Sequence, residues 1–206
     1  MSPLLAHEEV RPDEGATAGR IGYLHGVFGA GRNWRSVARR LAEGDPGWSG
    51  VLFDLRLHGD SVGFPPPHTI AACAEDVLAT IRAPGRGGGG SGLDVVLGHS
   101  FGGKVALELA RRDPAGLRQV WVVDAPPSAR QPGGTAWRML DVLHRRPGPF
   151  DDREEAVEAL ESEGYGTTVA RWMATNLEER DDGLRWALNL DGLEALLEDF
   201  FRVDLW

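Results

Sequence analysis

Residues 93–110 read LDVVLGHSFGGKVALELA. The apolar run Leu93–Leu97 predicts a buried strand, and the apolar residues further along recur at helical spacing. Between them, Gly98, Ser100 and Gly102 form the pattern G-x-S-x-G, which predicts a sharp strand-to-helix turn that exposes the Ser100 hydroxyl. Such a turn can hold a serine beside a base and beside oxyanion donors, both of which this weak nucleophile needs. Because the backbone of the turn is crowded, the flanking positions must lack side chains.

Two other interpretations of this stretch stay open. One is a tight glycine-rich turn without any chemistry. The other is a phosphate loop, because Gly98–Val105 is one residue short of G-x-x-x-x-G-K-[ST], and the run ending at Asp124 resembles a metal-binding strand. Val105, however, stands where a magnesium-binding hydroxyl is needed, and four expected core segments precede the loop. These two features disfavour the phosphate loop.

The whole chain has 206 residues and a formal net charge of −9. This length predicts one domain with a sizeable core. The acidic balance disfavours nucleic acid and anionic membranes as partners. The single cysteine, Cys73, lies in an apolar helical context and is expected to pack, so neither a disulfide framework nor a thiolate metal cluster is predicted. Residues 1–14 lack a long apolar run, and we expect a cytoplasmic protein without a membrane span.

Apolar segments of strand and helix type alternate between residues 20 and 125. Alternation of this kind predicts an α/β fold in which parallel strands are joined by crossover helices, with ligands bound beyond the carboxyl ends of the strands. The expected strands are Arg20–Leu24, Gly50–Leu55, Leu93–Leu97 and Gln119–Val123, and the expected helices are Asn33–Glu43, Thr69–Arg82 and Phe101–Arg112. Residues 84–92, PGRGGGGSG, precede a strand instead of following one, and we expect a flexible surface connection there.

The pattern changes after Pro126-Pro127. Residues 134–203 show helical periodicity and no convincing strand, so we divide the chain into an α/β core at 1–128 and a helical cap region at 129–206. Asp151 or Asp152, and also Asp191, are expected N-caps. Aromatic residues of the cap are expected mostly to pack it onto the sheet, although some could line a substrate pocket. They are Trp137, Tyr165, Trp172 and Trp186.

Two further motifs connect the chain to a known family. Tyr23–Gly29 reads YLHGVFG and resembles an oxyanion loop, and Asp54–Ser61 reads DLRLHGDS and resembles the signature D-x-R-x-H-G-x-S. Together with GRNWRSVARRLA at 31–42 and VVDAPP at 122–127, these motifs resemble the α/β-hydrolase superfamily, most of all the YbfF-type small serine esterases and their mitochondrial relatives. The resemblance covers about residues 4–200 and implies an α/β-hydrolase fold with a parallel sheet and a helical cap.

The resemblance also implies roles for particular residues. Ser100 would be the nucleophile, and the backbone N–H groups of Val27 and Phe101 would form the oxyanion hole. Asp124 would be the acid of the triad, although an aspartate at a strand end can also simply cap backbone N–H groups. His25 is expected to brace the oxyanion loop.

The resemblance further implies the order Ser, Asp, His, with the histidine on a loop after the last strand. Only His144 follows Asp124 in this sequence, and it falls in the cap. His58 is expected to hold the signature turn, while His99 neighbours Ser100 on a turn where adjacent side chains diverge. None of the six histidines is therefore expected to be a good general base: His7, His25, His58, His68, His99 and His144. We expect a hydrolase fold that is truncated at its C-terminus, has an exposed sheet edge at Gln119–Val123, and is inactive in this form.

The reaction implied by the resemblance is hydrolysis of a small acyl ester or thioester through an acyl-enzyme on Ser100. It needs no metal and no organic cofactor, and the expected partner is a small-molecule substrate. Two alternatives stay open, because the fold alone does not determine the function. One is a non-catalytic remnant that binds a ligand or a partner, and the other is a hydrolase or lyase of carbon–carbon bonds.

Overall fold

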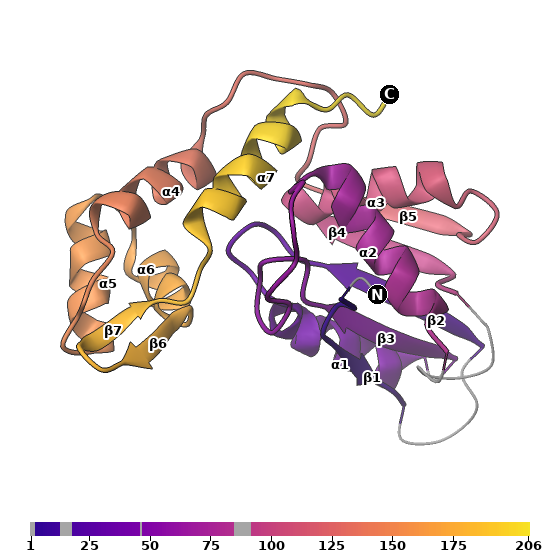
Figure 1. The fold of residues 1–206 in the computed structure, drawn as a ribbon. Coiled ribbons are helices and arrows are strands. Elements are labelled where there is room, and N and C mark those ends of the chain that lie inside the picture. The colour runs from indigo at the N-terminus through magenta and orange to yellow at the C-terminus, as the bar shows by residue number, and fades with distance from the viewer. Residues whose placement is uncertain (1–2, 13–17, 46, 85–91) are drawn as a thin grey trace.

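The structure is a computed structural model that describes residues 3–12, 18–45, 47–84 and 92–206. It consists of a sheet with helices on both faces, which we call the core, and a mostly helical region after residue 128, which we call the cap (Figure 1). The expected flexible connection at 84–92 falls largely outside the described residues. None of the described helices combines the length and the apolar character that crossing a membrane requires.

The core is built on a five-stranded sheet with the order β1-β3-β2-β4-β5. Four of its strands are parallel, as the alternating pattern predicted: β2 (Gly19–Leu24), β3 (Trp48–Phe53), β4 (Val95–His99) and β5 (Gln119–Val123). The sequence analysis missed β1 (His7–Val10), which pairs antiparallel with β3. The outer edge of β5 pairs with no other described strand, and Trp121 on it is 57% exposed.

The two faces of the sheet are covered by different helices. Helices α2 (Ile70–Arg82) and α3 (Phe101–Arg112) pack over the face that presents Leu24 and Phe53, where the main hydrophobic core lies. The other face presents Tyr23 to α1 (Arg35–Gly44), which follows a short 3-10 helix. Alternation of side chains along each strand sends successive residues to these two layers.

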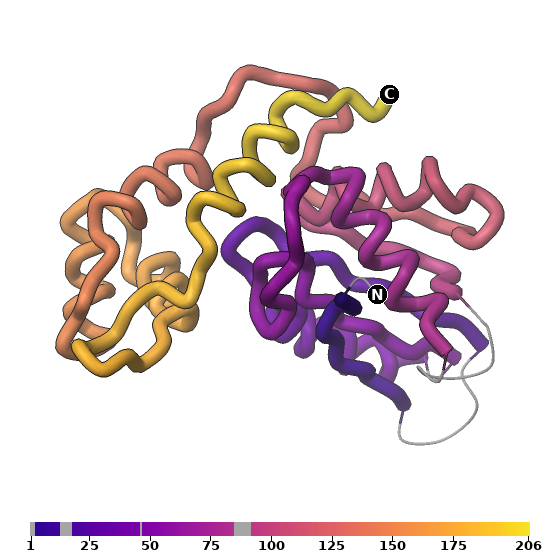
Figure 2. Tube along the Cα trace, in the orientation of Figure 1, coloured from indigo at the N-terminus to yellow at the C-terminus, as the bar shows by residue number. Residues whose placement is uncertain are grey.

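The cap contains four helices, which Figure 2 shows lying beside the carboxyl edge of the sheet. They are α4 (Thr135–Arg145), α5 (Arg153–Ser162), α6 (Thr167–Ala174) and α7 (Leu190–Arg202). The cap also contains an antiparallel hairpin of β6 (Leu177–Arg180) and β7 (Gly183–Trp186), so the expectation of a cap without strands was wrong. Each strand is only four residues long, and three of the four residues of β6 are charged, so the hairpin gives little signal in a search for apolar periodicity.

The residues at the N-termini of the cap helices were predicted only in part. The side chain of Asp152 accepts a hydrogen bond from the Glu155 N–H at 2.9 Å and caps α5, as predicted. The start of α7, in contrast, is capped by Asn189, whose side chain accepts from the Gly192 N–H at 2.9 Å. Asp191 lies inside the first turn, where its charge favours the positive end of the helix dipole without capping it.

A buried cation joins the cap to the core. Lys104 of α3 is the only lysine in the sequence and has no exposed surface. Its Nζ donates to the carbonyl oxygens of Ser128 at 2.9 Å, Phe200 at 2.7 Å and Val203 at 2.8 Å, so the segment that enters the cap and the end of α7 meet at one ammonium group. The last carbonyls of α7 carry the negative end of the helix dipole and therefore attract this charge.

Candidate active site

Ser100 sits at the turn between β4 and α3, as the sequence predicted. Its backbone adopts φ 50° and ψ −116°, a region that residues with a Cβ rarely occupy. Strain of this kind costs on the order of 1–3 kcal/mol and persists only where the surroundings impose it. Here the Ser100 N–H donates to the Val123 carbonyl at 2.8 Å, which ties the turn to the end of β5.

The glycines of the turn are required by close backbone contacts. A Cβ at Gly98 would lie 2.1 Å from the Gly102 carbonyl oxygen, and one at Gly102 would lie 2.5 Å from that of Leu24. Any side chain at either position would force the strand end and the start of α3 apart. The pattern G-x-S-x-G is therefore a steric requirement of this turn.

The predicted oxyanion loop follows β2 and is braced by His25. This buried side chain accepts the Leu55 N–H at Nε2, at 3.0 Å, and donates from Nδ1 to the Gly26 carbonyl at 2.8 Å. Burial, together with the neighbouring His58 ring, holds the pKa of His25 well below its usual value. His25 is thus a neutral ring with both nitrogens occupied, and its contacts are those of a bracing residue.

The loop then makes a tight turn, in which the Gly29 N–H donates to the Gly26 carbonyl at 3.0 Å. Phe28, at the second central position, has φ 66°, the conformation that a type II turn requires there and that usually selects glycine or asparagine. Val27 occupies the first central position. Neither the Val27 N–H nor the Phe101 N–H donates to an acceptor among the described residues, and Phe101 begins α3, where an orphan donor is expected.

The four residues predicted for catalysis line one cavity of about 450 Å³: Val27, Ser100, Phe101 and Asp124. Asp124 directly follows β5, has φ 53° and is exposed. Its carboxylate accepts no hydrogen bond among the described residues, so the alternative interpretation of Asp124 as a backbone cap finds no support in the contacts. Parallel strands thus bring β2, β4 and β5 residues to one sheet edge.

The opposite wall of this cavity comes from the cap, where the sequence indicated only that some of four aromatic residues could line a pocket. Of those four aromatic residues, Trp172 lines the cavity, while Trp186 packs against Phe150 instead. Helical periodicity indicates which residues of an amphipathic helix are apolar, but it does not distinguish packing from a pocket wall. The other apolar cap residues on this wall are Met139, Val169, Leu197, Phe200 and Phe201.

The histidines do not complete a triad with Ser100 and Asp124. His99 alone lines the same cavity, but its ring lies against Gly26, on the side of the oxyanion loop. His144 lies 3.8 Å from Glu194 within the cap. His58 donates from Nδ1 to the Arg56 carbonyl at 2.9 Å, and burial lowers its pKa to about 4. Among the described residues, no histidine is hydrogen-bonded to either Ser100 or Asp124.

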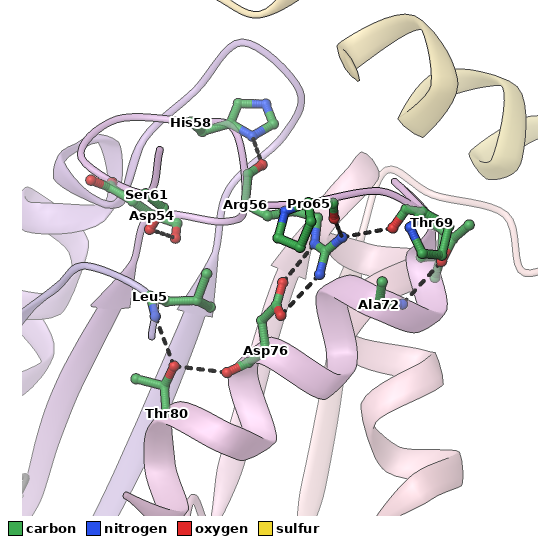
Figure 3. A network of polar contacts seen from close by, with 12 residues as sticks. Leu5, Asp54, Arg56, His58, Ser61, Pro65, Thr69, Ala72, Asp76 and Thr80 are labelled. Atoms are coloured by element: carbon green, nitrogen blue, oxygen red, sulfur yellow. Dashed lines mark hydrogen bonds and ion pairs between the residues drawn. The ribbon is translucent and has the colours of Figure 1, made fainter. Parts of the chain in front are cut away.

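The signature loop after β3 is held by a buried ion pair (Figure 3). The Arg56 guanidinium donates to both carboxylate oxygens of Asp76 on α2, at 2.6 and 3.0 Å, and also to the Pro67 carbonyl at 2.7 Å. Asp54 accepts the Gly31 N–H at 2.7 Å and the Asp60 N–H at 2.9 Å. These contacts give the motif D-x-R-x-H-G-x-S a structural role next to the oxyanion loop.

Comparison with known proteins gives relatives along most of the chain. A model of the alpha/beta hydrolase family matches residues 23–206. The sn-1-specific diacylglycerol lipase ABHD11 of Mus musculus is 30% identical over 192 residues, which cover 90% of this chain and 60% of the relative. The same lipase of Danio rerio is 29% identical over 182 residues, which cover 86% of this chain and 55% of the relative. This chain thus spans a little over half the length of these relatives.

The fold is also found among solved structures. A marine microorganism esterase is similar with a TM-score of 0.78 and 23% sequence identity, over 97% of this chain and 74% of that chain. The family match extends from the oxyanion loop through the serine turn into the cap, the three parts that form the cavity. The chain belongs to the alpha/beta hydrolase family.

Proposed function

We propose that the protein hydrolyses small acyl esters or thioesters through an acyl-enzyme on Ser100. The main support is the arrangement in one cavity of a serine on a strained strand-to-helix turn, together with two backbone N–H groups and a carboxylate that have no hydrogen-bond partner among the residues that the structure describes. The relatives named diacylglycerol lipase and the solved structure named esterase support an ester as the substrate. The apolar cap wall supports an apolar acyl group.

Each residue has a defined part in this reaction. Ser100 Oγ attacks the acyl carbonyl carbon, and a histidine accepts the hydroxyl proton and then passes it to the leaving alcohol or thiol. The Val27 and Phe101 N–H groups stabilise the negative charge that develops on the carbonyl oxygen, and the positive end of the α3 dipole adds to this effect. Asp124 orients the histidine, and water later releases the acid.

The histidine is the one part of this mechanism that no described residue supplies. Loss of the base in a serine triad costs roughly 10⁶ in kcat. We therefore expect the 206-residue chain to hydrolyse esters only at the low rate that oxyanion stabilisation and substrate binding give without a general base. To supply the histidine, the chain can be extended after Trp206 with the C-terminal part of the mouse relative.

The test is turnover of p-nitrophenyl acetate and butyrate by the 206-residue chain, the extended chain, and the extended chain with Ser100→Ala. We expect the extended chain alone to show normal turnover, at a rate roughly 10⁶-fold above the unextended chain. Equal turnover with and without Ser100 would exclude Ser100 as the nucleophile. Normal Ser100-dependent turnover by the unextended chain would show that a resident histidine, such as His144 or His99, is the base.

A further inference from the structure

A side-chain hydrogen bond links the cap to the predicted oxyanion loop. The Asn176 Nδ2 donates to the Phe28 carbonyl oxygen at 3.1 Å, across 148 positions of sequence. Among the described residues, this is the one hydrogen bond that joins residues 135–190 to the core. The other hydrogen bonds between the described parts of the cap and the core are made by residues 199–205, at and after the end of α7.

The backbone of Asn176 is fixed on the cap side of this contact. Its N–H donates to the Met173 carbonyl at 2.9 Å, at the end of α6, and its carbonyl accepts from the Ala187 N–H at 2.8 Å, just after β7. With both backbone groups engaged, the residue is held between the last turn of α6 and the hairpin. The position of the Asn176 side-chain amide is therefore fixed relative to the cap.

The acceptor on the core side is the strained residue of the oxyanion loop. Phe28 has φ 66° although it carries a Cβ, and its side chain is 3% exposed. A residue other than glycine in this region costs about 1–2 kcal/mol, so the turn needs outside contacts to persist. The Phe28 carbonyl belongs to the peptide that closes the turn, and Val27 is the preceding residue of the same turn.

Trp172 of α6 also lies beside the oxyanion loop. It lines the 450 Å³ cavity together with Val27 and Ser100, and also a neighbouring cavity of about 310 Å³ on the other side of the loop. Gly26 and Val27 line both cavities as well. The Trp172 side chain of α6 thus lies beside Gly26 and Val27 of the oxyanion loop, and the Asn176 amide is hydrogen-bonded to the same loop.

From these contacts we propose that Asn176 is a positioning residue, through which the seated cap holds the oxyanion loop in its strained turn. The cap then performs two tasks at once, since it supplies the acyl wall and also orients the Val27 N–H toward the developing oxyanion. Lifting the cap away breaks the Asn176 bond and lets Phe28 relax to negative φ. This inference rests on the proposed function for the assignment of Val27 as an oxyanion donor.

The experiment compares Asn176→Asp with Asn189→Asp in the full 206-residue chain. Both variants make the same change of atom and charge within the cap. At position 176 the change removes the donor and sets a carboxylate against a carbonyl, whereas at 189 the carboxylate still accepts the Gly192 N–H and caps α7. Asn176→Ala removes the donor without adding charge.

The first measurement is amide hydrogen exchange of peptides that cover residues 24–32. We expect exchange there to be about tenfold faster in both Asn176 variants than in Asn189→Asp, with unchanged exchange in β3 and β4, since a lost hydrogen bond of this kind is worth up to roughly 1.4 kcal/mol. Equal exchange in this segment for the Asn176 and Asn189 variants would overturn the proposal, whatever the protein catalyses.

The second measurement is the affinity for butylboronic acid, whose tetrahedral adduct with a serine resembles the oxyanion, and for the neutral butyramide. We expect the Asn176 variants to lose about 3–10-fold in boronate affinity and to bind butyramide as before. Unchanged boronate affinity in the Asn176 variants would contradict the role in the oxyanion hole. If Ser100→Ala binds the boronate as well as the unsubstituted chain does, then the proposed function is wrong, and the exchange result alone decides whether Asn176 holds the loop.

Discussion

The two walls of the cavity are held in different ways. The core wall consists of backbone segments in direct contact, where a Cβ on Gly98 would lie 2.1 Å from a neighbouring carbonyl oxygen. The cap wall packs on the core through apolar side chains, among them Phe200 against Phe101, and the side chains of Lys104 and Asn176 hydrogen-bond the two parts together. The two walls thus differ in the contact that fixes them, which is backbone against backbone in the core wall and side chain against side chain or backbone in the cap wall. We propose that the core wall carries the chemistry and that the cap wall selects the substrate.

The largest loss of stability is expected from adding one methyl group to the core wall. Gly98→Ala would push β4 and the start of α3 apart, and we expect it to lower the free energy of unfolding by about 4 kcal/mol or more, at the upper end of single-residue effects. Urea unfolding measures this loss. Gly44→Ala at the end of α1 is the control, because nothing lies within 4 Å of its added Cβ, and it should cost little. Similar losses in the two variants would refute the steric account of the turn.

The next effect comes from the buried histidines of the core wall. Their pKa values are lowered by burial, to about 4 for His58 and well below the usual value for His25, so the folded state takes up fewer protons than the unfolded chain. Stability is then complete above about pH 6.5 and is lost as the pH falls toward 4, and His58 accounts for roughly 3 kcal/mol of this loss. Unfolding measured between pH 7 and 4 should show a shallower decline in His58→Gln. An identical decline would contradict the neutral, buried state of His58.

A somewhat smaller effect is expected at the joint between the walls. Lys104→Met leaves one buried and two partly buried carbonyl groups without their donor, and we expect a loss of about 2 kcal/mol in the free energy of unfolding, with faster exchange at the end of α7. Arg118→Met removes the same charge from the exposed start of β5 and should be close to neutral. If Lys104→Met unfolds no more easily than Arg118→Met, the buried ammonium does not hold the cap.

The core wall could be predicted from the sequence, while much of the cap wall could not. The motif at Gly98–Gly102 depends on local backbone geometry, and the apolar runs of the inner strands β3 and β4 stand out because both of their faces are largely buried. Strand β1 was not predicted because glutamate residues such as Glu8 and Glu9 disfavour strands. Its place is fixed by pairing with β3, a segment about 40 positions away in the sequence, and the Glu8 carboxylate is paired at the surface with Arg35, which lowers the pKa of that carboxyl.

The cap contact at Asn176 shows the same limit. Nothing in the sequence around it indicates a partner 148 positions away, because a lone asparagine between a helix and a hairpin usually serves the local turn. The N-cap of α7 could not be predicted for a similar reason. Asn189 and Asp191 are both good capping residues, and only the backbone angles decide between them. Side-chain contacts between distant segments must therefore come from the structure.

The most direct test of the central claim is to map the site of covalent labelling by a fluorophosphonate probe on the extended chain. The account predicts a single adduct, located by tandem mass spectrometry on the Ser100 hydroxyl, that disappears in Ser100→Ala and is strongly reduced in Asp124→Asn. Labelling of another residue, or an unchanged adduct yield after Ser100→Ala, would contradict it.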